Sequence, residues 1–216
     1  PLLAGIRGAL ALADLDPNAP ELASVARGER RVAVAWQERQ ARDPARWSTT
    51  LTEAEGRLRV QGEKAYVVGA GEVDLLLVAG REKAGLAVAL VEKGSEGLGL
   101  TPLRSFGNEP QAHVRFDDVV ALRRIGAGTG TESAVARVER RQAALALAEM
   151  VGGMSAVLTM TVEYVKQREQ FGQKIAIFQA VRHQIADAGT VFTAARHLAW
   201  QAITRIAAGT EQGTEL

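Results

Sequence analysis

The residues best suited to chemistry lie in one short segment, EYVKQREQFGQKIAIFQ, at positions 163–179. Arg168 comes at the end of a stretch with helical periodicity. A guanidinium at a helix end can bind a pyrophosphate through two parallel hydrogen bonds, and it stays charged at any pH that a cell experiences. Phe171, Phe178 and Gln179 follow closely. The segment is therefore compatible with a contact to a phosphorylated ligand.

A purely structural interpretation of the same segment stays open. Arg168 would then complement the negative end of the helix dipole. Gly172 would terminate the helix, and Phe171 and Phe178 would be core residues. Each of these roles is common in helical proteins, so the pattern of residue types alone does not decide between them.

Residue content narrows the possible chemistry further. The chain has no cysteine, which excludes disulfides, thiolate metal sites and a cysteine nucleophile. Its three histidines, His113, His183 and His197, are too scattered in the sequence to predict a metal cluster. Any catalysis must therefore depend on a bound cofactor or on carboxylates.

Charge and hydropathy exclude several partners. The 216 residues include 26 Lys and Arg against 25 Asp and Glu, a balance that predicts neither nucleic-acid nor anionic-membrane binding. The apolar stretch at the start contains Arg7 and lacks a basic leading region, so we expect neither a signal peptide nor a membrane span. We expect a cytoplasmic protein, and the abrupt ends are typical of a segment of a longer one.

The elements that must position these residues change character near residue 128. Upstream, short apolar or alternating runs separated by Gly, Pro and charged turns predict strands; they lie at 31–36, 57–60, 64–68, 74–79, 85–91 and 112–116. Their rhythm predicts an antiparallel β-sandwich or barrel at residues 29–128. Glycine adopts positive φ at no steric cost, so we expect chain reversals at Gly56, Gly62, Gly80 and Gly94.

Downstream, the pattern is helical. TGTE at 129–132 fits a capping box that starts a long helix. Apolar residues at steps of three and four then form one stripe from Leu147 to Val165 and another from Ile185 to Ile206. These stripes predict the start of an antiparallel helical bundle at residues 129–216. We interpret residues 1–28 as the tail of a preceding helical domain, which makes the whole chain a multidomain α+β protein.

Three segments in this order resemble the acyl-CoA dehydrogenase family: GEKAYVVGAGEVDLLLVA, VRFDDV and EYVKQREQFGQKIAIFQAVRHQIAD. The last is the most specific, because its residue types and spacing both match the family; the matching positions are Arg168, Gln170, Phe171, Gly172, Phe178 and Gln179. The resemblance covers roughly residues 29–210. In the family these are the middle β domain and the first helices of the C-terminal domain.

The resemblance implies FAD as cofactor, an acyl-CoA thioester as substrate and an electron-transfer flavoprotein or similar electron acceptor. In the family, the positions of Arg168, Gln170, Phe171 and Gln179 reach across a subunit interface to the FAD of a neighbouring chain. Oligomerisation is then part of the site, which implies a homotetramer or a heterotetramer.

Several expected flavin contacts are altered. Where the family usually has Trp beside the flavin and a Thr or Ser hydroxyl bonded to its ring, this chain has Tyr66 and Val68. Tyrosine still supplies an aromatic wall, but valine cannot donate a hydrogen bond. Trp36 and Gln37, followed by Glu38, take the place of the family's Thr-Glu-Pro run.

The glycine-rich stretch that follows this run in the family is also altered. Arg39, Gln40 and Arg42 stand there instead. Close backbone approach to a phosphorylated ligand is harder without glycine. Two interpretations stay open: the arginines contact phosphates of CoA, or they are solvated loop charges.

No catalytic base is predicted within the chain. The family's glutamate base usually comes from a segment beyond residue 216. A subset of the family places it on the long helix, and the corresponding position here is Gln142, which has no proton to exchange. Glu139 lies one helical turn away, where a solvated carboxylate is the simpler interpretation.

The leading hypothesis is an FAD-dependent α,β-dehydrogenation of an acyl-CoA thioester. A first alternative is a non-catalytic partner subunit that contributes flavin contacts to a heteromeric acyl-CoA dehydrogenase, which the changes at Val68 and Gln142 favour. A second alternative is a helical interaction module without flavin.

Overall fold

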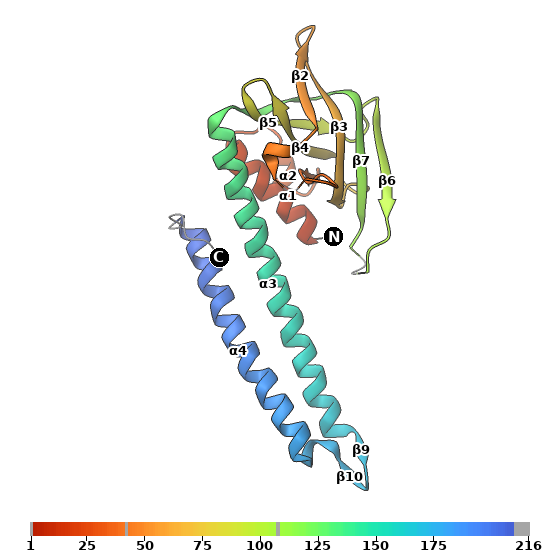
Figure 1. Cartoon of the computed structure of the whole chain (residues 1–216), viewed down its shortest axis with the longest axis vertical. Helices are drawn as coiled ribbons and strands as arrows, with labels where there is room; N and C mark the ends of the chain where they lie inside the picture. Colours follow the sequence, from red (N-terminus) through yellow and green to blue (C-terminus); the bar gives the residue numbers. More distant parts are fainter. Residues whose placement is uncertain (1, 42, 107–108, 210–216) are drawn as a thin grey trace. The chain divides into compact units, whose positions relative to one another are not determined.

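The computed structural model describes residues 2–41, 43–106 and 109–209 (Figure 1). The chain forms two compact units, residues 1–138 and 139–216. The first contains helices α1 (Leu2–Leu15) and α2 (Leu22–Ala26), a β-sheet and the beginning of α3 (Thr129–Gln167). The second contains the rest of α3, a two-stranded hairpin and α4 (Gln179–Ala208). A sheet domain followed by long helices agrees with the predicted α+β class.

The sheet is largely antiparallel. Its path runs β6-β7-β3-β2-β4-β5-β8, and β1 joins it by pairing with β4. The strands are β1 Val32–Ala35, β2 Thr50–Ala54, β3 Arg57–Val68, β4 Leu75–Glu82, β5 Gly85–Glu92, β6 Leu98–Leu103, β7 Gln111–Val120 and β8 Arg123–Ala127. A short 3₁₀ turn, η1 (Pro44–Arg46), precedes β2.

The two central strands β4 and β5 are buried on both faces, because successive side chains of a strand point to opposite sides. One side joins the core against β3 and β7, through Leu76, Val78, Ala87, Ala89 and Val91. The other side joins the core against α1, Trp36, Trp47 and the first turns of α3, through Leu75, Leu77, Ala79, Leu86, Val88 and Leu90. This double burial explains why the two strands read as nearly continuous apolar runs in the sequence.

The N-terminal helices cover this second face of the sheet. Gly8 lets α1 lie directly against β1, because a Cβ at this position would overlap the Val32 carbonyl oxygen. Arg123 at the start of β8 donates to Glu21 at 3.1 and 2.7 Å and to Asp16 at 2.9 Å, which fixes the turn between the two helices. The hydrogen bond from Arg123 is the main cause of the lowered pKa of the Glu21 carboxyl.

Some strand predictions were wrong in detail. The runs at 57–60 and 64–68 form one strand, β3, which passes through Gly62 without a reversal. Gly80 likewise lies inside β4. In contrast, Gly56 and Gly94 lie in turns, as predicted. β1 runs parallel to β4, so the sheet is not wholly antiparallel.

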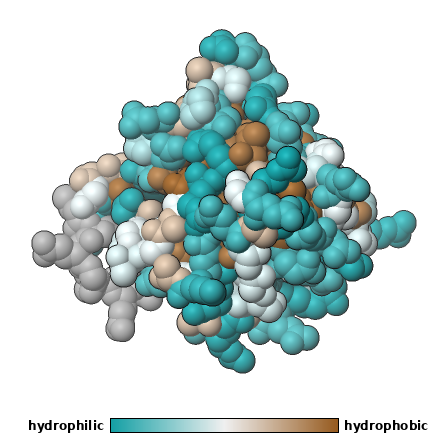
Figure 2. Space-filling model, turned by 90° about the horizontal axis from the view of Figure 1, so that it is seen from above, coloured by the Kyte–Doolittle hydropathy of each residue, from teal (hydrophilic) through white to brown (hydrophobic). Residues whose placement is uncertain are grey.

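Three strands of the large sheet were not predicted: β2, β6 and β8. Each of them has few or no buried positions. Alternation of apolar and polar residues is weak in such strands, so their sequences resemble loops. On the face shown in Figure 2, hydrophilic residues form most of the surface, and hydrophobic residues are visible only in small patches between them.

The two predicted long helices are present as α3 and α4. Between them the chain forms the hairpin β9 (Glu169–Gln170) and β10 (Gln173–Lys174), followed by a short 3₁₀ turn, η2 (Ile175–Ile177). α3 is long and apolar enough to cross a membrane by length and composition alone. One helix of this kind is weak evidence of a membrane span, since the core helix of a soluble protein passes the same test.

We expect Gly80→Ala to destabilise the sheet, although the backbone at Gly80 is not in the left-handed region. An added Cβ would overlap Leu51 Cδ1 and lie 2.8 Å from the Thr49 carbonyl oxygen. Overpacking of this kind costs about 1–3 kcal/mol. Chemical denaturation of both variants would measure this, with Gly94→Ala as the control, since a Cβ at Gly94 meets nothing within 4 Å. Equal midpoints for the two variants would contradict the packing described above.

Candidate functional site

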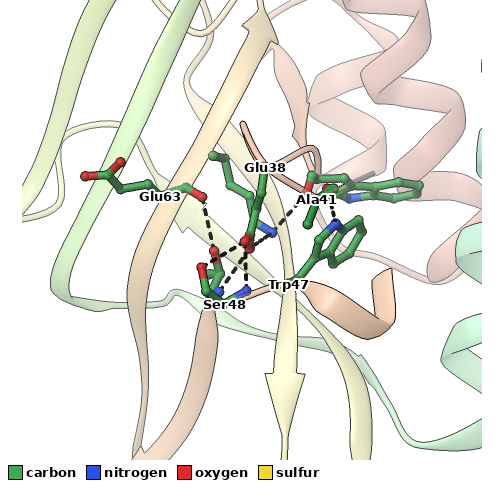
Figure 3. A network of polar contacts seen from close by, with 8 residues as sticks. Glu38, Ala41, Trp47, Ser48 and Glu63 are labelled. Atoms are coloured by element: carbon green, nitrogen blue, oxygen red, sulfur yellow. Dashed lines mark hydrogen bonds and ion pairs between the residues drawn. The ribbon is translucent and has the colours of Figure 1, made fainter. Parts of the chain in front are cut away.

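The most tightly built polar group in the first unit is an ion pair between Glu38 and Lys64 (Figure 3). Lys64 is 1% exposed and Glu38 is 8% exposed. The Lys64 Nζ donates to Glu38 Oε1 and to the Trp36 carbonyl oxygen, both at 2.9 Å. It also lies 4.2 Å from the centre of the Trp47 ring, a cation–π distance. The ammonium is therefore fully surrounded.

The carboxylate of Glu38 is equally well satisfied. Oε2 accepts from the Ser48 amide at 2.7 Å and from the Ser48 hydroxyl at 2.8 Å. Oε1 accepts from the Thr49 amide at 2.9 Å in addition to Lys64. These bonds tie three segments together: residues 36–38, the start of β2 and the middle of β3.

The environment shifts the pKa of both groups. Burial lowers the pKa of the Lys64 ammonium to about 8, although Glu38 offsets part of this effect. Burial alone would raise the pKa of the Glu38 carboxyl. The donors from Ser48, Thr49 and Lys64 outweigh it and lower the pKa to about 2. The pair is thus ionised at neutral pH.

The predicted contacts of the first unit lie around this pair. Trp36 is buried, and its Nε1 has no hydrogen-bond partner among the described residues. Gln37 is exposed, and its carbonyl oxygen accepts from the Ala65 amide at 2.7 Å, which joins it to β3. Tyr66 follows directly, 47% exposed and with a left-handed φ of 56°. Val68 is half-buried and pairs with Gln111 of β7.

Sequence reasoning missed the part that Lys64 and His113 take in this region. Lys64 shares the strand face of Leu58 and Val60, which are buried, so its inward direction was readable from the alternation in β3. His113 packs edge-on against Tyr66, with ring centres 5.4 Å apart. That contact joins β3 to β7 at a bulge. Because the two residues are far apart in the sequence, no local pattern predicts it.

The predicted contacts of the second unit lie on and around the hairpin β9–β10. Arg168 comes directly after α3 and is exposed, and its guanidinium has neither an ion pair nor a hydrogen bond among the described residues. Gln170 and Gln179 are also exposed. Phe171 is 92% exposed and packs edge-to-face against Phe178, with ring centres 6.1 Å apart.

These positions contradict two parts of the structural alternative for this segment. Phe171 is not a core residue, since it is almost fully exposed. Gly172 does not terminate the helix, because α3 ends at Gln167. Phe171 and Gly172 instead form the hairpin turn, with φ of 54° and 75°. Positive φ at both central residues is the pattern of a type I′ turn.

The residues present fit a flavin nucleotide in part. An exposed, unpaired guanidinium beside two aromatic rings suits a pyrophosphate and an adjoining ring system. Val68 offers no hydroxyl to the flavin ring. On α3, Gln142 cannot act as a base, while desolvation raises the pKa of the nearby Glu139 carboxyl. No group of three metal-ligating side chains occurs within the described ranges.

Comparison with known proteins identifies relatives of both units. Residues 128–216 match the family model "Acyl-CoA dehydrogenase, C-terminal domain". The chain is 29% identical over 187 residues to the probable acyl-CoA dehydrogenase FadE25 of Mycobacterium tuberculosis, covering 81% of this chain and 48% of that protein.

Solved structures agree with this relationship. The ChsE4-ChsE5 complex from Mycobacterium tuberculosis matches with a TM-score of 0.82 and 27% identity, over 96% of this chain and 56% of that one. Butyryl-CoA dehydrogenase from Megasphaera elsdenii matches in fold, with a TM-score of 0.88 and 21% identity, over 96% and 58%. The chain spans about half the length of the curated relatives it matches.

We expect the Glu38–Lys64 pair to control stability in acid. The folded pKa of Glu38, about 2, lies below its ordinary value of 4.5. Its stabilising contribution is therefore complete above pH 4.5 and is lost as the pH falls from there to 2. At 1.36 kcal/mol per pKa unit, the loss is about 3 kcal/mol. Denaturation midpoints measured between pH 7 and pH 2 should show this slope in the wild type and not in Glu38→Gln.

Glu63→Gln is the matched control, because Glu63 is an exposed carboxylate one residue from Lys64. It should keep the wild-type slope. At pH 7 we expect Glu38→Gln to lose about 3–5 kcal/mol, since it leaves the Lys64 charge buried without a counterion. An acid slope that persists in Glu38→Gln would assign the acid sensitivity to other carboxylates.

Proposed function

Because this chain belongs to the acyl-CoA dehydrogenase family, we propose that it supplies flavin-binding residues to an assembly that dehydrogenates an acyl-CoA thioester between its α and β carbons. The observation that carries the proposal is the Arg168 guanidinium, which is exposed, without an ion-pair partner among the described residues, and in the same short segment as two phenylalanine rings that pack together. FAD, when bound, supplies the acceptor of the substrate hydride.

In this proposal the β9–β10 hairpin of the second unit and the residues on either side of it bind the cofactor of a neighbouring subunit. Arg168 binds the pyrophosphate bidentately. Phe171 and Phe178 cover the adjoining rings, and Gln170 and Gln179 donate or accept hydrogen bonds through their amides. The type I′ turn holds Phe171 outward, so that its ring is available to another chain.

The first unit offers a wall for the flavin ring. Tyr66 presents its exposed ring, Val68 an apolar surface, and Gln37 the edge of the loop before β2, while Trp36 is buried. The buried pair of Glu38 and Lys64 holds these residues in place from behind. Without a hydroxyl at position 68, this wall excludes water but gives no hydrogen bond to the ring.

Exposed apolar side chains support an oligomer. Along α3 and α4 of the second unit they include Met150, Val157, Met160, Tyr164, Val191, Leu198 and Trp200, each between 59% and 71% exposed. Soluble monomers rarely expose so many large apolar residues on two helices. Contacts between subunits, in a homotetramer or a heterotetramer, would cover such faces, and electrons would leave the assembly to an electron-transfer flavoprotein or similar acceptor.

A second candidate is a non-catalytic partner subunit in a heteromeric acyl-CoA dehydrogenase. Gln142 in place of a base and Val68 in place of a hydroxyl favour it. The similarity to a chain of the ChsE4-ChsE5 complex supports it as well. In this candidate the chain keeps its Arg168 segment for the FAD of the partner subunit and leaves proton abstraction to that subunit.

The first test is a visible absorption spectrum of the whole protein that contains this chain, before and after addition of acyl-CoA thioesters. If the leading proposal is right, the protein is yellow and one thioester bleaches it. A colourless protein that takes up FAD only with a second subunit would instead establish the partner role. A colourless protein that takes up no FAD in either condition would contradict both candidates and leave a helical interaction module.

We expect Arg168→Gln to weaken FAD binding in the assembled protein. Loss of a charge-assisted hydrogen bond costs about 1.5–3 kcal/mol, or about tenfold or more in Kd. Flavin fluorescence during titration of the apoprotein measures the affinity. Lys166→Gln is the matched control. Lys166 is an exposed cation two residues before Arg168, and it already forms an ion pair with Glu163 at 2.9 Å. Equal affinities in both variants would remove Arg168 from the cofactor site.

A further inference from the structure

Three side chains from distant parts of the first unit meet on its surface: Arg39, Tyr66 and His113. The Arg39 Nη2 lies 2.8 Å from the His113 Nε2, although 74 residues separate them. The His113 ring packs against Tyr66 at an interplanar angle of 61°. The group therefore combines a guanidinium, an imidazole and a half-exposed phenol ring in one place.

Hydrogen-bond chemistry fixes the direction of the contact. A guanidinium has only donors, so the His113 Nε2 must accept, and the ring proton lies on Nδ1. Arg39 keeps further N–H groups, and no carboxylate pairs with it in the part of the chain that the structure describes. By contrast, Arg59, Arg123 and Arg124 on the same sheet each have a carboxylate partner.

The backbone presents these groups in a fixed arrangement. Arg39 lies in a tight turn closed by a bridge between Glu38 and Ala41, and the carboxylate of Glu38 anchors that turn in the core. Tyr66 has its left-handed φ at a bulge in the pairing of β3 with β7. A non-glycine residue holds this conformation only where its surroundings enforce it, and such positions cluster at ligand sites.

We propose that Arg39 and His113 form an oxyanion-binding site beside Tyr66, one that takes a phosphate or a carboxylate group. The donors left on Arg39 match a bidentate oxyanion, and His113 holds the guanidinium in place by accepting one of its hydrogen bonds. The side chains offer N–H donors and no carboxylate, so a cation does not fit. This site goes beyond the proposed function, because its two contacts, Arg39–His113 and His113–Tyr66, form without a flavin.

Ring signals of the histidines give a direct test, because the sequence contains only His113, His183 and His197. Long-range ¹H–¹⁵N correlation spectra of the flavin-free chain would be followed while inorganic phosphate replaces chloride at constant ionic strength. We expect a saturable shift of the His113 signals. His183 and His197 are exposed on α4 and serve as internal controls, since nonspecific anion effects would move them as well.

Two variants distinguish binding at this site from a general effect of the protein's positive charge. Arg39→Gln should weaken phosphate binding about tenfold, as expected for the loss of a charge-assisted pair. Arg57→Gln removes an equal charge from an exposed position at the opposite end of β3 and should leave binding unchanged. No saturable shift at His113, or equal affinity in both variants, would overturn the proposal.

Further titrations distinguish the source of the anion. Coenzyme A or FAD binding more tightly than inorganic phosphate through Arg39 would indicate a nucleotide phosphate. Acetate competing with phosphate at equal concentration would indicate a carboxylate of the substrate. Either result supports the oxyanion site. Because the readout is a histidine signal in flavin-free protein, failure here leaves the flavin titration of Arg168→Gln unaffected.

Discussion

The buried ion pair of Glu38 and Lys64 is the constraint on which the first unit depends. Replacing such a pair with apolar residues is often neutral or stabilising, because desolvation costs about as much as the attraction returns. Stability alone does not explain its presence. The pair instead joins the loop before β2 to the middle of β3, with hydrogen bonds to both oxygens of Glu38 and two hydrogen bonds from the Lys64 ammonium. Its effect is to fix the positions of Gln37, Arg39 and Tyr66 at the surface.

Two exposed aromatic residues have a strained backbone conformation. Tyr66 in the first unit and Phe171 in the second are aromatic residues with left-handed φ, and both are exposed. Left-handed backbone costs such residues about 1 kcal/mol or more. Neither side chain recovers that cost through burial in its own unit. Phe171 has this conformation within the type I′ turn and Tyr66 at the bulge of β3, and these two devices leave both rings exposed at positions proposed to contact the flavin.

Local patterns predicted some parts of this structure and not others, for physical reasons. β4 and β5 were recognisable because burial on both faces makes them continuously apolar, and α3 and α4 because their stripes repeat over many turns. The edge strand β6 was not, because few of its side chains are buried. The Arg168 segment was found because its residues are neighbours in sequence, whereas Arg39 and His113 meet only through the pairing of the sheet.

Some positions of the acyl-CoA dehydrogenase motifs are retained in this chain and others are altered, and the two sets differ in the role they would have. Everything that would touch the phosphates and outer rings of a neighbour's cofactor is kept in the Arg168 segment. The position that would give the flavin ring a hydroxyl is changed to Val68, and Gln142 stands where a subset of the family has its base. A change in substrate alone would alter neither of these two positions, since neither selects an acyl chain. Retention of the Arg168 segment, together with the absence of a hydroxyl at position 68, supports the proposed role of binding the cofactor of a neighbouring chain.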